Sequence, residues 1–129
     1  MESFFQFKNP VLKEIEFKIN DGFVNNVSNE VKITANMSVR INRQAVINEA
    51  VVDLAVKIGA ERDDVPYYIY VVEGANFKWK EGLGEDQINS LLNVNAPTLL
   101  LSYLRPIVSQ ITSASMYGAY NIPFMNFVD

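Results

Sequence analysis

The residues that most often perform enzyme chemistry are missing from this chain. The sequence contains no histidine and no cysteine. Histidine is the commonest general base and metal ligand, and cysteine supplies thiolate ligands and disulfides. The hydroxyls of Ser109, Ser113 and Ser115 therefore have no histidine to activate them. The sequence predicts a protein that is not an enzyme and that has neither a cofactor nor a metal site.

Carboxylates are the next groups that could do chemistry. Glu14 and Glu16 share one face of a predicted strand, and Glu61, Asp63 and Asp64 lie in one predicted turn. That turn lacks the alternating ligands and the glycine of a calcium loop. Because short runs of surface charge are usually solvated, we interpret both groups as surface charge.

Basic and aromatic residues alternate in one segment, where Lys78 and Lys80 interleave with Phe77 and Trp79. Such interleaving is found in proteins that bind single-stranded nucleic acid. Nucleic-acid binding depends mainly on clustered positive charge. This chain has a net charge of −4 and no cluster of Lys and Arg, so we expect no nucleic-acid partner.

The elements that must position these residues begin with four predicted strands. Apolar and polar residues alternate most clearly from Val31 to Ile41, which predicts a strand with one buried and one wet face. Pro10 interrupts the first strand because proline cannot donate to a β-ladder, and Gly74 predicts a bulge or bend in the fourth. The predicted strands cover residues 4–19, 30–42, 45–60 and 67–80.

Helices follow the strands. A short helix is predicted over 85–92, and Asn95 and Pro97 then predict the N-cap and first turn of a main helix over 96–113. Pro106 predicts a kink, and residues 119–127 are expected to be extended. An apolar stripe along the main helix comprises Leu100, Leu104, Ile107, Val108 and Ile111. The fold class is therefore α+β, with a four-stranded antiparallel sheet followed by one long helix in a single domain over 1–129.

The chain carries more aromatic residues and methionine than such a fold can bury. It has eight Phe, six Tyr, one Trp and four Met, and a sheet with one helical layer leaves one face uncovered. A large exposed apolar surface is typical of a subunit interface or a binding groove. Methionine and aromatic side chains adapt to varied apolar partners.

The sequence also bears on compartment. The first residues, MESFFQFKNP, lack the basic and apolar regions of a signal peptide. No apolar run approaches the roughly 18–20 residues that span a bilayer. We expect a cytoplasmic protein without membrane insertion.

The last quarter of the chain resembles the SecB family of protein-export chaperones. Its segment NAPTLLLSYLRPIVSQITSASMYGAYNIPFMNF is similar to the family pattern of a small residue and proline, an L-x-x-Y-x-R helix, and a crossover loop ending in N-F. The matching residues are Ala96, Pro97, Leu100, Tyr103, Arg105, Pro123, Phe124, Met125, Asn126 and Phe127. EIEFKIN at 14–20 and VKITAN at 31–36 resemble the first two strands of the family.

The resemblance implies a function and its sites. It implies a tetramer built as a dimer of dimers, with an interface formed by Leu100, Tyr103, Leu104, Ile107 and Ile111. It implies ATP-independent holding of unfolded or precursor polypeptides in an apolar groove. The expected client-contact residues are Val31, Ile33, Phe77, Trp79, Tyr117, Tyr120, Ile122 and Phe124. Docking to the translocation ATPase would use Glu14 and Glu16.

Two departures and two alternatives accompany the resemblance. Lys18 and Tyr70 stand where we expect further docking carboxylates. Family members continue after N-F with another helix, whereas this sequence ends at Asp129. Besides export, SecB-like proteins serve as chaperones of toxin–antitoxin modules, and a non-chaperone oligomeric scaffold is a further hypothesis.

Overall fold

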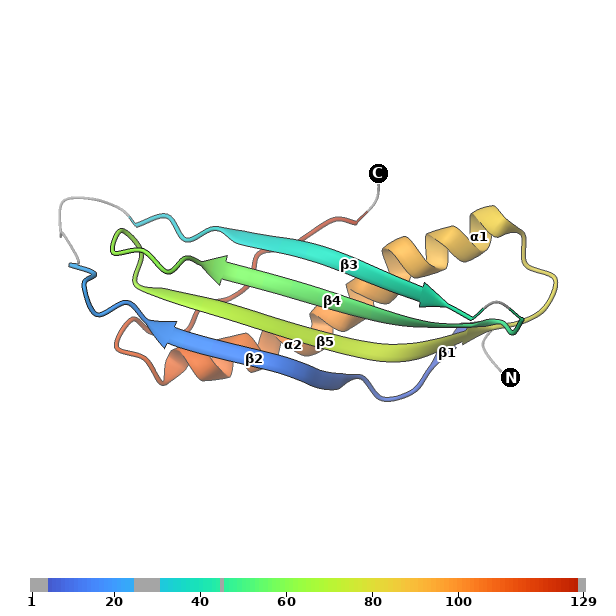
Figure 1. The fold of residues 1–129 in the computed structure, drawn as a ribbon, viewed down its shortest axis with the longest axis horizontal. Coiled ribbons are helices and arrows are strands. Elements are labelled where there is room, and N and C mark those ends of the chain that lie inside the picture. Colours follow the sequence, from blue (N-terminus) through green and yellow to red (C-terminus); the bar gives the residue numbers. More distant parts are fainter. Residues whose placement is uncertain (1–4, 25–30, 45, 128–129) are drawn as a thin grey trace.

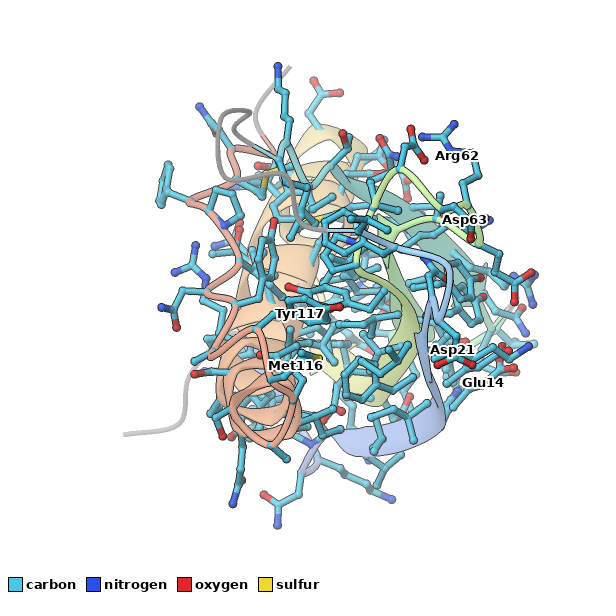
Figure 2. All side chains as sticks on the ribbon, turned by 90° about the vertical axis from the view of Figure 1, so that its left-hand side faces the viewer. Glu14, Asp21, Arg62, Asp63, Met116 and Tyr117 are labelled. Atoms are coloured by element: carbon cyan, nitrogen blue, oxygen red, sulfur yellow. The ribbon has the colours of Figure 1, made fainter. Side chains whose placement is uncertain are left out.

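A computed structural model describes residues 5–24, 31–44 and 46–127. One antiparallel sheet forms one layer, and the helices with the C-terminal segment form the second layer on a single face of that sheet (Figures 1 and 2). We call the covered side the helix face and the other side the open face. This is the predicted α+β architecture.

Five strands make up the sheet, and all described pairings are antiparallel. The strands are β1 (Phe5–Phe7), β2 (Val11–Ile19), β3 (Ala35–Arg43), β4 (Glu49–Gly59) and β5 (Tyr67–Trp79). The spatial order is β1-β5-β4-β3, and β2 also pairs with β5. β1 pairs with residues 77–79 of β5, and β2 with residues 67–74. β1 and β2 therefore lie one after the other along the same edge of the sheet, with the interruption before Val11 that Pro10 predicted. The five strands thus form a sheet that is four strands wide.

The strand ends differ from the prediction at two places. β3 begins at Ala35 because its partner β4 ends at Gly59, whose φ of 70° turns the chain away. β4 begins only at Glu49, and Val46 in the preceding connection is 94% exposed. The predicted strand ends at Phe4, Glu30 and Ala45 lie outside the described residues.

The core lies between β4, β5 and the helices. Alternate residues of both strands point to the helix face and are buried, as the period of two predicted. On β4 these are Ala50, Val52, Leu54, Val56 and Ile58, and on β5 they are Tyr67, Ile69, Val71, Glu73, Ala75, Phe77 and Trp79.

A bulge in β2 changes the predicted faces of that strand. Leu12 pairs with Glu73 and Glu14 pairs with Val72, so Lys13 is an extra residue. This insertion places Leu12 on the helix face with Ile15, where simple alternation had put them on opposite faces. The bulge that was predicted at Gly74 of β5 therefore lies in the partner strand β2, at Lys13.

Gly74 has a different structural role. The Nζ atom of Lys13 on β2 reaches Oδ1 of Asp53 on β4 at 2.6 Å, and this ion pair crosses above β5. A Cβ atom at position 74 would collide with the Asp53 carboxylate and the Lys13 side chain. Glycine therefore leaves room for the two side chains that pass over this position.

The helical region is continuous from Glu85 to Ser113. It comprises α1 (Glu85–Ser90), the π-helical turn η1 (Leu91–Asn95) and α2 (Ala96–Ser113). The predicted N-cap at Asn95 is wrong, since Asn95 is helical and makes no capping hydrogen bond. Pro97 cannot donate to Asn93, and the Ala96 amide donates to Leu91 O in a wider i−5 turn. α2 continues through Pro106.

Candidate functional site

The edge strand β2 leaves apolar side chains uncovered on the helix face. Ile15, Phe17 and Ile19 pair with Val71, Ile69 and Tyr67 of β5 and share their face. Leu12, Ile15 and Ile19 are 42, 39 and 40% exposed. These values arise because β2 forms one margin of the sheet, where its apolar side chains are only partly covered.

An apolar groove opens where the last turns of α2 approach β2. Its volume is about 470 Å³. It is lined by Phe17 and Ile19 from β2, and by Ile111, Ala114, Ser115 and Met116 from the end of α2 and the following turn. None of these lining residues of the described chain is charged, so the groove suits apolar groups of a ligand.

The segment after α2, residues 114–127, forms the predicted crossover loop and is tied to the helix. The Tyr120 amide donates to Oγ1 of Thr112 at 2.7 Å, and this hydroxyl donates to Val108 O at 2.7 Å. Farther along, Nη2 of Arg105 donates to Pro123 O at 3.0 Å. These bonds hold the loop alongside α2 on the helix face.

Aromatic contacts fix the beginning of the loop. The Tyr117 ring meets Tyr67 of β5 at a centroid distance of 6.1 Å and Phe23 at 5.7 Å, both edge-on. Phe17 packs edge-on against Tyr67 at 5.8 Å. Burial, with a smaller contribution from Tyr120, raises the pKa of Tyr67 to about 12. The cluster therefore holds Tyr67 neutral beside the groove.

Two apolar side chains of the loop project into solvent. Met116 is 85% exposed and Phe124 is 82% exposed. Figure 2 shows Met116 and Tyr117 at one end of the molecule, beside the end of α2. Met116 also lines the groove. This end of the molecule therefore has apolar groups both inside the groove and projecting from the surface.

The predicted client-contact residues do not form one surface. Tyr117 and Tyr120 are half-buried, Ile122 is buried in the core, and Phe124 is exposed. Val31 and Ile33 precede β3, the edge strand opposite β2, and Ile33 packs against the core. None of them lines the groove, and only Tyr117 directly follows a residue that does, Met116.

Phe77 and Trp79 need a correction. Phe77 is fully buried and is covered by Phe5, whose ring stacks on it at 5.2 Å. Trp79 is 6% exposed, and the Arg43 guanidinium lies 5.3 Å from its ring centroid. Both side chains point into the subunit, so we do not carry them into the proposed groove.

The groove residues that sequence reasoning missed are Phe17, Ile19, Ala114, Ser115 and Met116. The alternation of apolar residues in β2 was visible in the sequence. That β2 is an edge strand facing the end of α2 was not visible.

The predicted interface residues of α2 divide into two groups. Leu100 and Leu104 are fully buried against their own subunit, which corrects their assignment to a surface. Tyr103 is 39% exposed, and Ile107 and Ile111 are half-buried. The last three remain candidates for an interface.

The open face carries the predicted docking carboxylates. Glu14 is exposed without an ion pair among the described residues, and Glu16 is bound to Nζ of Lys18 at 2.9 Å. A hollow of about 580 Å³ beside Glu14 is lined by both charge signs, including Lys13, Arg40 and Asp53 around Tyr70. The face is therefore a mixed surface and not an acidic one.

The described part of the chain has neither a metal-binding cluster nor a membrane-spanning helix. Its carboxylates nowhere gather in a group of three that could hold a metal ion. Within the same residues, no helix is long and apolar enough to span a membrane.

Comparison with known proteins decides the family. The family model of the preprotein translocase subunit SecB matches residues 5–129. The chain belongs to the SecB family. A search of curated protein sequences gave no match.

A solved structure of a SecB-like chaperone shares this fold. A SecB-like chaperone of Mycobacterium tuberculosis, solved with a ChAD peptide from the HigA1 antitoxin, is similar with a TM-score of 0.71 and 12% identity. The match covers 95% of this chain and 88% of the other. A Streptococcus agalactiae protein of unknown function matches with a TM-score of 0.49 and 11% identity, over 93% and 97% of the two chains.

Proposed function

We propose that this chain is an ATP-independent chaperone that holds unfolded or export-bound polypeptides in the apolar groove between β2 and the end of α2. The observation that carries the proposal is the groove itself, an open apolar depression bordered by an exposed methionine. Family membership supports it. We place the protein in the cytoplasm, where unfolded precursors would meet it, and assign it no catalytic role.

The groove offers two means of holding a polypeptide. Apolar side chains of the client would enter between Phe17 and Ile111, where water is displaced from both surfaces. The exposed Met116 can change rotamer to fit clients of different shape, as methionine-rich binding surfaces do. Tyr117, Tyr120 and Ile122 would then support the loop from below, while Phe124 contacts the client.

We propose that the chain works as a homo-oligomer, a tetramer made as a dimer of dimers. The exposed apolar residues of β2 and the outward face of α2, at Tyr103 and Ile107, would provide the contacts. If the translocation ATPase docks on the open face, Glu14 is the carboxylate free to receive it.

The test is suppression of aggregation of a chemically unfolded client, without nucleotide. Met116→Glu places a charge at the groove, and Val46→Glu places the same charge on a similarly exposed apolar residue of the β3–β4 connection. We expect Met116→Glu to weaken client binding about tenfold, equivalent to about 1.4 kcal/mol, and Val46→Glu to leave it unchanged. Equal behaviour of the two variants, or no effect of the wild type on several unfolded clients, rejects the groove.

A second candidate is a chaperone of a toxin–antitoxin module. The similar Mycobacterium tuberculosis chaperone is bound to an antitoxin peptide, and this favours the idea. Tight binding of one antitoxin segment with weak binding of unrelated unfolded clients would support it over the export role. A single folded partner without any unfolded client would instead support an oligomeric scaffold.

A further inference from the structure

Glu73 is a carboxylic acid placed among apolar side chains. It lies on the helix face of β5 and is 2% exposed. Its cross-strand neighbours are Leu12 of β2 and Leu54 of β4. A buried glutamate is uncommon unless another group pairs with it, so its surroundings decide its charge.

Glu73 has no such pair. Its Oε1 atom is buried and has no hydrogen-bond partner among the described residues. The strands packed against β5 provide no cation on this face. β1 has no ionisable side chain, and Lys13 at the β2 bulge is bound to Asp53 across the open face. The other ionisable residues of β2 and β4 alternate to the open face, namely Glu14, Glu16, Lys18, Glu49 and Lys57.

The helix packed against β5 provides no counter-charge either. The ionisable residues of α2 are Tyr103 and Arg105. Tyr103 is neutral in its ordinary state, and the Arg105 guanidinium donates to Pro123 O on the crossover loop. An ionised carboxylate without a partner is strongly disfavoured in such a site, whereas the neutral acid is not. Accordingly, burial raises the pKa of Glu73.

Glu73 lies next to the first half of β2, so the cost of ionising its carboxylate acts on that end of the strand. The bulge at Lys13 lies directly beside Glu73, and Leu12 opposite it is partly exposed at the sheet margin. β2 pairs only with β5, so its first half is held by one row of backbone bonds and by the ion pair that Lys13 makes with Asp53 on the open face. Opening there is the shortest way to bring water to the carboxylate, because the other side of β5 is covered by β4.

We propose that Glu73 is a proton-controlled switch on the edge strand β2. Neutral Glu73 lets the first half of β2 stay paired with β5. Ionisation releases that half, and with it the apolar side chains of Leu12 and Ile15. The switch therefore loosens the edge of the sheet as pH rises, and it does not depend on whether the groove holds clients.

The direction follows from linkage. A carboxyl group whose pKa is raised on folding stabilises the fold relative to its ionised form at low pH. That contribution is complete below the unfolded value of 4.5 and is lost as pH rises through the folded value. Local opening of β2 relieves the same cost without unfolding the whole chain.

The experiment is amide hydrogen exchange of residues 11–19 in the wild type, Glu73→Gln and Glu14→Gln. It spans pH 4.5, the ordinary value of a glutamate, to about 9, the upper end known for buried ones. Rates are corrected for the intrinsic effect of pH. Glu73→Gln keeps the size of the side chain but cannot ionise, and Glu14→Gln removes an exposed carboxylate from the open face of the same strand.

We expect wild type and Glu73→Gln to exchange alike at pH 4.5. Their ratio in β2 should then grow with pH, by up to about tenfold per pH unit, while Glu14→Gln follows the wild type. Identical pH profiles for wild type and Glu73→Gln overturn the switch, and so does an equal acceleration in β3 and β4. If Glu73→Gln fails to fold, carboxyl-carbon NMR of the wild type decides, and titration of Glu73 near 4.5 rejects the proposal.

Discussion

Tyr67 joins the core of the sheet to the crossover loop, and its hydroxyl shows how a single residue depends on that packing. Its ring contacts Phe17 and Tyr117, and its pKa is raised to about 12 mainly because burial disfavours the phenolate. In the unfolded chain the same hydroxyl ionises near 10. The folded state therefore favours the protonated form of the Tyr67 hydroxyl more than the unfolded state does.

A pH prediction follows at this scale. Because the folded pKa of Tyr67 is above the unfolded value, its contribution is complete below pH 10 and is lost as pH rises through about 12. Alkaline unfolding can be monitored by tyrosinate absorbance and circular dichroism. We expect the stability of Tyr67→Phe to fall less steeply with pH than that of the wild type. Tyr103→Phe removes a more exposed phenol and serves as the control. If both variants unfold like the wild type between pH 10 and 12, Tyr67 does not drive this transition.

Thr112 provides a second residue-scale prediction. Its hydroxyl accepts a hydrogen bond from the Tyr120 amide and is fully buried. Thr112→Val keeps the shape but leaves that amide without its acceptor, which should cost about 1–3 kcal/mol of unfolding free energy. Proteolysis within residues 116–124 should also become faster.

Ser113→Ala is the matched control for Thr112→Val. The Ser113 hydroxyl also donates to a helical carbonyl, Gln110 O, but it is exposed and does not contact the loop. We expect its loss to change denaturant unfolding little. If Thr112→Val lowers the unfolding free energy no more than Ser113→Ala does, the hydrogen bond from the Tyr120 amide does not hold the loop.

At the scale of elements, β2 and β4 are connected across β5 by the Lys13–Asp53 ion pair. The bulge aims Lys13 over Gly74, and the ion pair holds the edge strand to the centre of the sheet. Asn20 at the end of β2 makes a second connection, since its amide donates to Ala60 O and Val65 O in the β4–β5 turn. The edge strand is thus held by side chains beyond its backbone ladder.

Gly74→Ala tests this arrangement. The added methyl group should displace the ion pair and cost about 1–3 kcal/mol in denaturant unfolding, as overpacking usually does. In a background with both Lys13→Ala and Asp53→Ala the same substitution should cost less, because the colliding atoms are gone. A double-mutant cycle measures this difference. An unchanged cost in that background would place the strain in the backbone instead.

At the scale of the whole molecule, two layers leave an apolar margin along β2 and the outward side of α2. Outside the groove, the remaining exposed residues include Leu12 and Ile15 on the strand and Tyr103 on the helix. An exposed edge strand with apolar side chains invites association. This is the surface that we propose for assembly of the subunits.

Ile15→Glu should separate the proposed oligomer into smaller species in sedimentation velocity, because it places a charge within that margin. Lys57→Glu changes the charge of an exposed strand residue on the open face and should leave the oligomer intact. Folding of both variants is checked by circular dichroism. If Ile15→Glu sediments like the wild type, the margin of β2 is not the interface.

The sequence by itself determined the strands, their antiparallel order, the long helix and the family resemblance. These rest on short-range patterns: alternation in β4 and β5, the break at Pro10 and the stripe of α2. It also indicated an apolar surface, since aromatic residues exceeded what one layer could bury. None of this required knowing which strands lie at the margin.

Only the tertiary structure decided which of the apolar residues are exposed. Phe77 and Trp79 are aromatic residues of the kind found in binding surfaces, but they lie under Phe5 and Arg43. Phe17 and Met116, in contrast, border the groove. One extra residue at Lys13 reversed the face of Leu12, and this depended on its register against Glu73. Exposure is set by contacts between residues far apart in the chain, and alternation along one strand does not encode those contacts.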